Sequence, residues 1–258
     1  MGYILAPLFD SHSSQPRTIG AIGMQWSGRG CAFIQNMASL HLATLHTLDM
    51  THTPGIVAAL FIETGGCYTG LPGVDPWDIT RDARQYAGPW PVVAHPPCQR
   101  WGRFWHGSPC KPHQYKLGDD QGCFASALAS VRQWGGVLEH PADSQAWKHH
   151  GIPAPKRGAG WLRINAREWT CYVEQGHYGH VARKGTWLFY VGSISPPALT
   201  WSRLPQRLDP VLLARYGYQY ARRAGMVAMI GGKRKTELRN ATPPAFRDVL
   251  LAIAKDSA

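Results

Sequence analysis

Acidic residues and long apolar runs are both scarce in this sequence of 258 residues. It contains 16 Asp and Glu against 27 Lys and Arg, which gives a formal net charge of +11. Such an excess favours a polyanionic partner, and nucleic acid is the commonest of these. None of the apolar runs approaches the roughly 18 residues that a membrane-spanning helix needs, so we expect no association with a membrane.

Close cysteine pairs and a clear secretory signal are also missing. The six cysteines stand apart in the sequence, which is typical of free thiols in a reducing compartment. We therefore expect a cytoplasmic protein. With 44% hydrophobic residues the chain can bury one sizeable core, and we expect it to be a monomer.

Histidines and cysteines crowd residues 95–123, and a metal site must be weighed there. The segment Cys110-Lys111-Pro112-His113 has a C-x-x-H spacing that can bind zinc. No second close pair accompanies it. Trp101 stands where a zinc deaminase would carry its second cysteine, so we predict no metal.

The positive charge is concentrated towards the C-terminal end. Residues 201–239 contain nine Lys and Arg against Asp209 and Glu237, a net charge of +7. We expect this segment to contact a polyanion, and the alternative is an ordinary solvated basic face. Residues 1–52 show neither a charge excess nor a clear period and are expected to be an N-terminal extension.

Apolar runs and helical periodicity alternate from residue 55 onward. Strands are predicted at the runs rich in β-branched or aromatic residues, which cover residues 56–62, 92–94, 137–138, 169–174 and 186–191. Helices are predicted over 121–134 and 245–254, where apolar residues recur at helical spacing. A helix followed by a strand is typical of a mainly parallel sheet, so we predict an α/β fold with helices on both faces.

The strand predicted at 92–94 leads into the most reactive residue of the chain. Pro96 and Pro97 cannot continue the strand, which leaves Cys98 at its end. Strand ends are the usual place of active sites in open α/β sheets. Arg100 and Arg103 follow and are expected to favour a thiolate. The alternative is a buried, inert cysteine.

Five short motifs, in this order, resemble those of the DNA cytosine-5 methyltransferases. They are Asp78-Ile79-Thr80, Pro97-Cys98-Gln99, Leu138-Glu139-His140-Pro141, Tyr178-Gly179 followed by Arg183-Lys184, and Asn240-Ala241-Thr242-Pro243-Pro244. The likeness runs from about residue 57 to the C-terminus and is to a compact, phage-type member. It implies a methyltransferase-like, Rossmann-type catalytic domain over 53–200 and 240–258, with 201–239 as a small basic DNA-recognition insertion.

The resemblance also implies roles for individual residues. Cys98 is the expected nucleophile for carbon 6 of a pyrimidine, Glu139 the group that grips the ring nitrogen, and Arg183 a residue of the base pocket. The residues expected to bind S-adenosylmethionine are Phe61, Glu63, Gly65, Gly66, Asp78 and Asn240. The residues expected to contact DNA are Gln99, Arg100, Arg103, Lys184, Arg222, Arg223, Arg234 and Lys235.

Three departures from the family pattern concern the cofactor and the base. Glu63 stands where the family has the first glycine of its cofactor loop. Only eleven residues separate Gly66 from Asp78, so we expect the strand and helix that normally hold the cofactor ribose to be missing. His140 replaces an asparagine. We therefore expect S-adenosylmethionine to bind weakly or not at all.

Three functions stay open. The leading one is methyl transfer from S-adenosylmethionine to carbon 5 of cytosine in DNA. The second is a DNA hypermodification transferase that uses the same thiolate on a 5-substituted pyrimidine without that cofactor. The third is an inactive DNA-binding relative, in which Glu139 only caps a helix or pairs with an arginine and Arg183 and Lys184 are surface charge.

Overall fold

The computed structural model describes residues 55–107, 110, 114–204, 213–219 and 235–257. The expected extension 1–52 lies outside the described residues, as do three of the expected DNA contacts, Arg222, Arg223 and Arg234, and the side chain of Lys235. Within the described ranges, no helix is both long enough and apolar enough to cross a membrane.

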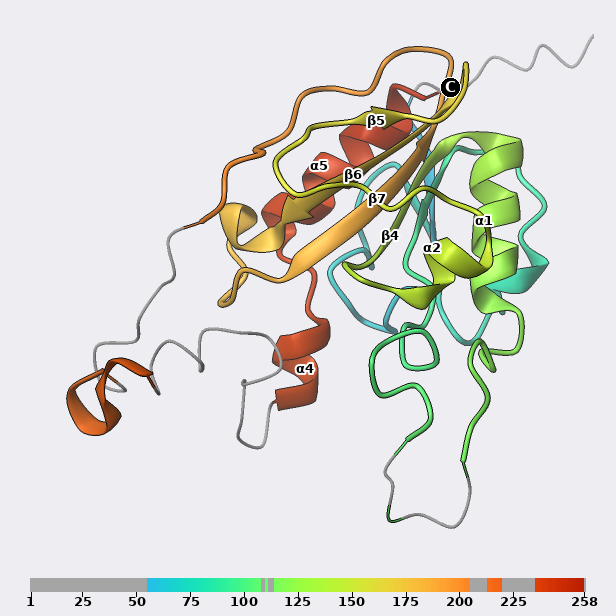
Figure 1. The fold of residues 1–258 in the computed structure, drawn as a ribbon. Coiled ribbons are helices and arrows are strands. Elements are labelled where there is room, and N and C mark those ends of the chain that lie inside the picture. The colour runs from blue at the N-terminus through green and yellow to red at the C-terminus, as the bar shows by residue number, and fades with distance from the viewer. Residues whose placement is uncertain (1–54, 108–109, 111–113, 205–212, 220–234, 258) are drawn as a thin grey trace, which may run out of the picture. The chain divides into compact units, whose positions relative to one another are not determined.

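A seven-stranded mixed sheet forms the centre of the fold (Figure 1). Its strands are β1 (Val57–Leu60), β2 (Val74–Trp77), β3 (Val92–Ala94), β4 (Gly136–Pro141), β5 (Leu162–Arg163), β6 (Glu168–Glu174) and β7 (Gly185–Val191). Their order is β2-β1-β3-β4-β7-β6-β5. The first four strands in that order run parallel to one another, which confirms the predicted α/β class and its parallel core.

The other half of the sheet is antiparallel. β7 pairs antiparallel with both β4 and β6, and β5 pairs antiparallel with β6. β6 and β7 are antiparallel because the connection between them is short and contains the 3-10 turn η2 (Gln175–Tyr178). A connection of that length joins antiparallel neighbours, whereas a parallel pair needs a longer crossover.

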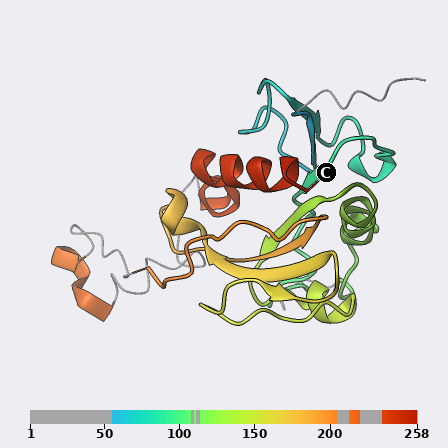
Figure 2. The same cartoon turned by 90° about the horizontal axis from the view of Figure 1, so that it is seen from above.

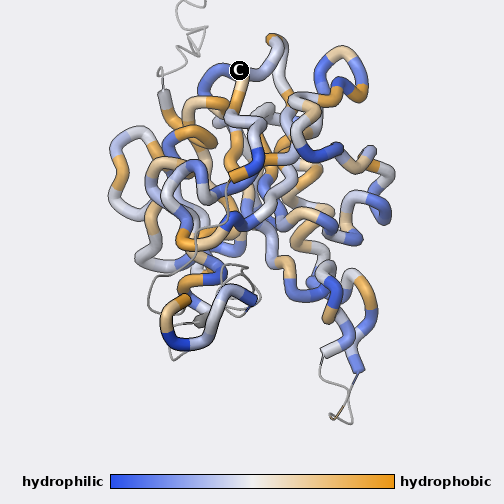
Figure 3. The backbone as a smooth tube through the Cα atoms, turned by 60° about the vertical axis from the view of Figure 1, so that its left-hand side comes forward, coloured by the Kyte–Doolittle hydropathy of each residue, from blue (hydrophilic) through white to orange (hydrophobic). Residues whose placement is uncertain are grey.

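Helices cover both faces of the sheet, as predicted (Figure 2). The helices α1 (Cys123–Trp134) and α2 (Gln145–His149) pack on one face, in a core with Leu138 and Phe189. The helix α5 (Pro244–Lys255) packs on the other, in a core with Val93 and Val137. Because side chains alternate along each strand, both faces are apolar in the strands at the centre. Figure 3 accordingly shows hydrophobic segments, in orange, in the central part of the described fold.

Shorter elements lie in the loops and near the C-terminus. The 3-10 turn η1 (Ala83–Gln85) lies between β2 and β3. Residues 213–219 are helical, and α4 (Lys235–Asn240) precedes α5. The segment 201–239, for which no period was predicted, therefore contains helical residues among its described part.

The strand order reverses beside β1, because the chain passes outward to β2 and returns to β3 on the other side. In open α/β sheets ligands bind in the crevice that such a reversal leaves at the carboxyl ends of the strands. The expectation that a strand and a helix are both missing after Gly66 is wrong in part. β2 fills it and ends directly before Asp78. What the described chain has no room for is a helix, since residues 61–73 contain only turns.

Candidate active site

The parallel strands β3 and β4 bring the two main candidate residues to one edge of the sheet. Cys98 follows the carboxyl end of β3, and Glu139 lies near the carboxyl end of β4. Alternation along β4 puts Glu139 on the α5 side and its neighbour His140 on the α1 side, where His140 stacks against Trp147 and contacts Phe124. The glutamate and the histidine that replaces the family's asparagine therefore have separate surroundings.

Glu139 is buried, with 7% of its surface exposed, and both carboxylate oxygens have partners. Oε2 lies 2.9 Å from His95 Nδ1, and Oε1 accepts a hydrogen bond of 2.9 Å from Gln175 Nε2. Burial alone would raise the pKa of this carboxyl group. The hydrogen bond and charge interaction with His95, together with the Lys184 ammonium, outweigh burial and lower the pKa of Glu139 to about 2. The group is thus a carboxylate at neutral pH.

Behind Glu139 stands a histidine that sequence reasoning weighed only as a metal ligand. His95 directly follows β3, and its Nε2 lies 2.8 Å from the hydroxyl of Tyr68, which is also buried. Burial raises the pKa of the Tyr68 hydroxyl well above its ordinary value. Sequence reasoning missed Tyr68 and Gln175 altogether. The only available signal was the position of His95 at a predicted strand end.

Lys184, predicted as a DNA contact, lies at this site. It has a left-handed backbone (φ 40°), and its Nζ donates hydrogen bonds to the carbonyl oxygens of Asn240 (3.2 Å) and Ala241 (2.8 Å). Burial lowers the pKa of Lys184, and the charges of Glu139 and Cys98 act in the opposite direction. The ammonium group is therefore the positive charge that acts on both candidate residues.

Arg183, predicted for the base pocket, is placed differently. Its carbonyl oxygen accepts a hydrogen bond of 3.1 Å from the backbone of Gly176, at the start of the connection between β6 and β7. Within the described residues no hydrogen bond or ion pair joins its guanidinium to Cys98 or Glu139. In this structure the cation beside the thiol is therefore Lys184.

Cys98 is a partly exposed free thiol. Burial raises its pKa, the carboxylate of Glu139 raises it further, and Lys184 lowers it. Arg100 and Arg103, which were expected to favour the thiolate, are not among the groups that shift the pKa of Cys98. The chain turns at Cys98, whose carbonyl accepts a hydrogen bond of 3.0 Å from the Trp101 amide.

The residues after Cys98 form a braced loop between β3 and α1. The guanidinium of Arg100 lies 3.3 Å from the centre of the Tyr115 ring and donates to the carbonyl of Trp105 (3.4 Å). Arg100 therefore holds the loop together, whereas Gln99 and Arg103 are exposed and open to a partner. At the base of the loop, buried Trp101 donates to Asp120 (2.7 Å).

The residues expected to bind the cofactor follow β1 and β2. Glu63 and Gly65 are exposed, and Gly65 has a positive φ of 70° with open space around its α-carbon. The hydroxyl of Thr64 donates to Asp78 (2.8 Å), which joins the two loops. Phe61 and Gly66 are partly exposed in the same loop. Asn240 is not in this group; its carbonyl holds Lys184 and its side chain is exposed at the end of α4.

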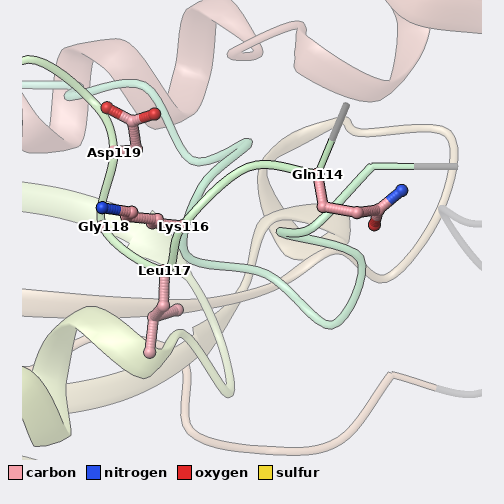
Figure 4. Close-up of a pocket in the computed structure, with 5 residues that line it drawn as sticks. All are labelled: Gln114, Lys116, Leu117, Gly118 and Asp119. Carbon is pink, nitrogen blue, oxygen red and sulfur yellow. The ribbon is translucent and has the colours of Figure 1, made fainter. Parts of the chain in front are cut away.

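Two other features of the described chain bear on ligand binding. A cavity of about 380 Å³ opens on the loop before α1 (Figure 4); it contains none of the candidate catalytic residues and is lined by Gln114, Lys116, Leu117, Gly118 and Asp119. Among the described residues no group of three or more His, Cys, Asp or Glu is arranged to hold a metal ion. His113 of the C-x-x-H segment lies outside the described residues.

Comparison with protein-family models, with curated proteins and with solved structures finds no match to this chain. The likeness to the DNA cytosine-5 methyltransferases therefore depends on the five short motifs. Three of these motifs supply Asp78, Cys98 and Glu139, which follow or end three parallel strands of one sheet. Function must be argued from that arrangement.

Proposed function

We propose that this protein modifies a pyrimidine base in DNA through covalent addition of Cys98, and that the leading reaction is methyl transfer to carbon 5 of cytosine. One observation carries the proposal. A partly exposed thiol shares the carboxyl edge of a parallel sheet with a buried carboxylate, Glu139, and Lys184 interacts with both. Perturbed ionisable groups that converge at a strand edge are typical of catalytic sites.

The chemistry needs each of these groups. Carbon 5 of a pyrimidine is a poor nucleophile until a thiolate adds to carbon 6, and a thiolate both attacks and leaves readily. The charge of Lys184 favours the thiolate of Cys98. The carboxylate of Glu139 has free lone pairs beside its two present hydrogen bonds, so it can accept from the exocyclic amino group and, once ring nitrogen 3 is protonated, from that nitrogen.

The loops after β1 and β2 fit a cofactor that carries a ribose and a positive charge. Hydrogen bonds from Thr80 and Thr64 lower the pKa of Asp78, whose carboxylate is placed as ribose-binding acids are at the end of a second strand. Ile79 beside it is 89% exposed and offers an apolar surface to a base. Glu63, Gly65 and Asp78 would hold S-adenosylmethionine, which would supply an electrophilic methyl group.

A donor other than S-adenosylmethionine is a second candidate, because of two features of the loop after β1. Glu63 replaces a glycine of the family's cofactor loop, and residues 61–73 contain no helix whose N-terminus could face the cofactor. These features favour the alternative in which the thiolate step is kept and another group is transferred to a 5-substituted pyrimidine.

The loop that follows Cys98 is suited to DNA. A base inside a duplex is out of reach of the thiol, so the enzyme must flip it out or act on a single strand. Phe104 is 72% exposed on the braced loop, next to exposed Arg103. Proteins that open a duplex often insert an apolar side chain between bases and hold the phosphates with arginine.

The test is trapping of the covalent adduct. Duplex and single-stranded DNA containing 5-fluorocytosine or 5-fluorouracil would be incubated with the protein, with S-adenosylmethionine or with cell extract as the source of donor. We expect a denaturation-resistant complex, because fluorine cannot leave carbon 5 as a proton does. Cys98→Ser should form none, while Cys123→Ser, at a partly buried cysteine in α1, should behave as the parent.

Each outcome separates the candidates. Trapping with the pure cofactor supports methyl transfer, whereas trapping only in extract supports another donor. DNA binding without trapping under any condition would leave the inactive DNA-binding relative. An adduct that forms equally well in Cys98→Ser would show that the thiolate mechanism is wrong.

A further inference from the structure

A continuous chain of hydrogen bonds runs behind the candidate nucleophile. It starts at the hydroxyl of Tyr68, passes through both nitrogens of His95 (2.8 and 2.9 Å) and reaches the carboxylate of Glu139. From the other oxygen of Glu139 it continues to Gln175, whose amide nitrogen also donates to Thr186 (2.9 Å).

The direction of the hydrogen bonds follows from the ionisation of Glu139. A carboxylate only accepts, so Nδ1 of His95 must carry a hydrogen and donate it to Glu139. Nε2 of His95 then either accepts from the Tyr68 hydroxyl or, in the imidazolium, donates to it. The amide of Gln175 cannot change its charge. Protons can therefore enter or leave the carboxylate only from the His95 side of this chain or from a bound ligand.

This series of hydrogen bonds would be an unfavourable way to hold β3 and β4 together. Burying a carboxylate and an imidazole costs solvation free energy that an apolar pair would not lose, so a buried ionic pair is weak grounds for a purely stabilising role. β3 and β4 already pair through their backbones, and Val93 and Val137 contribute apolar packing beside this site. A titratable pair placed at the strand edge that carries the candidate nucleophile points to chemistry instead.

We infer that Tyr68, His95 and Glu139 form a proton relay that delivers a proton to ring nitrogen 3 of the target base as Cys98 adds to carbon 6. Glu139 is the group that touches the base, and His95 is a positioning residue that acts through it. This inference rests on the proposed function, of which it specifies the proton path.

The electrons and protons of the step balance as follows. The bond between Cys98 Sγ and carbon 6 forms, the C5=C6 pair shifts to C4=C5, and the C4=N3 pair becomes a lone pair on nitrogen 3. The imidazolium of His95 passes a proton to the Glu139 carboxylate, which passes it on to nitrogen 3 and is left unprotonated, as before the step. In uracil, whose nitrogen 3 already carries a hydrogen, oxygen 4 takes this proton instead. The thiol has lost its proton to solvent before the step and the base gains the one that His95 gives up, so the neutral adduct needs no other reactant. Elimination runs the same steps in reverse.

Several charged or titratable groups face the relay and set its response to pH. Lys184 and His95 face Glu139 from the β6–β7 connection and from β3, and His140 lies on the opposite side of β4. Tyr68 is close to Cys67 and to the Arg247 and Asp248 pair of α5. Among the residues that the structure describes, only the His95 imidazole is hydrogen-bonded to both Tyr68 and Glu139. His95 is therefore the residue to substitute.

The experiment measures exchange of the hydrogen on carbon 5, which needs the adduct but no donor. DNA of random sequence labelled with tritium at carbon 5 of cytosine, and a second sample labelled in uracil, would be incubated with the protein between pH 5 and 9. For the parent we expect tritium release whose pH profile reflects both the ionisation of Cys98 and the proton that the relay supplies.

Two variants interrupt the relay at different points. His95→Asn keeps an amide donor where Nδ1 faces Glu139 but cannot pass on a proton, so exchange should slow by about 100-fold and the shape of the pH profile should change. Tyr68→Phe removes the outer end of the relay and should slow exchange by about tenfold or less while keeping the shape of the parent's pH profile. Tyr86→Phe, at a buried tyrosine whose hydroxyl donates to Trp90 elsewhere in the fold, is the matched control and should behave as the parent.

The result that overturns the inference is a His95→Asn protein whose pH profile keeps the shape of the parent's, whether or not its rate falls, because a purely structural histidine would change the rate alone. A parent protein that releases no tritium from either DNA would instead overturn the proposed function, and the relay with it. Release in the parent together with an unchanged profile in the variant overturns the relay only.

Discussion

Burial of His140 should make the stability of this protein depend strongly on pH. The ring is 1% exposed, lies 2.8 Å from the hydroxyl of Ser144 through Nδ1, and stacks on Trp147. Burial lowers the pKa of His140 from 6.5 to about 4, although the carboxylate of Glu139 acts in the opposite direction. The native protein therefore holds this imidazole neutral at pH values where the unfolded chain protonates it.

The size of the effect follows from the difference between the two states. A decrease in pKa from 6.5 to about 4 corresponds to about 3 kcal/mol of unfolding free energy. Because the native pKa is the lower one, this stability is fully present above pH 6.5 and is lost as the pH falls towards 4. About 2 kcal/mol should be lost between pH 7 and pH 5.

The substitution that tests this is His140→Phe, which keeps an aromatic ring against Phe124 and Trp147 but cannot be protonated. Losing the hydrogen bond to Ser144 should cost about 1 kcal/mol at pH 7. At pH 5 the variant should instead be more stable than the parent by about 1 kcal/mol. Urea unfolding followed by the fluorescence of the 11 tryptophans at both pH values measures the difference.

A control separates packing from titration. Phe124→Leu alters the ring that contacts His140, with centroids 5.2 Å apart, without removing an ionisable group. It should destabilise the protein by the same amount at pH 7 and pH 5. If the parent and His140→Phe lose stability in parallel as the pH falls, the neutral, buried state of His140 is refuted.

Three further predictions concern the candidate site and its partners. Lys184→Met should raise the pKa of Cys98 and leave about tenfold less thiolate at neutral pH, as measured by the pH dependence of alkylation in a protein whose other cysteines are replaced; an unchanged alkylation profile would contradict the role of Lys184. Asp78→Asn should weaken binding of S-adenosylmethionine by about tenfold in calorimetry, and equal affinity would remove Asp78 from the cofactor site. Neutralising four basic residues should reduce the slope of log affinity for DNA against log salt by about 3 to 4, equally for all sequences, and an unchanged slope would count against this segment as the DNA contact. These residues are Arg222, Arg223, Arg234 and Lys235.

The sequence by itself determined the parallel core of the fold and the position of the candidate nucleophile. The apolar runs at 92–94 and 137–138 predicted β3 and β4, because a strand buried on both faces needs such a run. Pro96 and Pro97 end the first of them, so Cys98 had to follow a strand end. The alternation of strand and helix then placed helices on both faces.

Strand β2 could not be predicted in the same way. Its residues, Val74–Trp77, include an aspartate and a proline and lie at the edge of the sheet, where only one side needs backbone pairing. Propensity therefore indicated a loop, and the eleven residues between Gly66 and Asp78 led to the expectation that the family's strand and helix are missing. Pairing with β1 overrides that local preference.

Only the tertiary structure decided which side chains surround Cys98. His95 and Glu139 are 44 residues apart in the sequence, and Gln175 reaches Glu139 across 36 residues. Arg100 is near Cys98 in sequence but is held by Tyr115, whereas Lys184 arrives from the connection between β6 and β7. A sequence pattern reports the backbone preferences of neighbours along the chain. The charge on a thiol or a carboxylate depends on groups within a few ångströms in space, and the packing of the sheet brings those together.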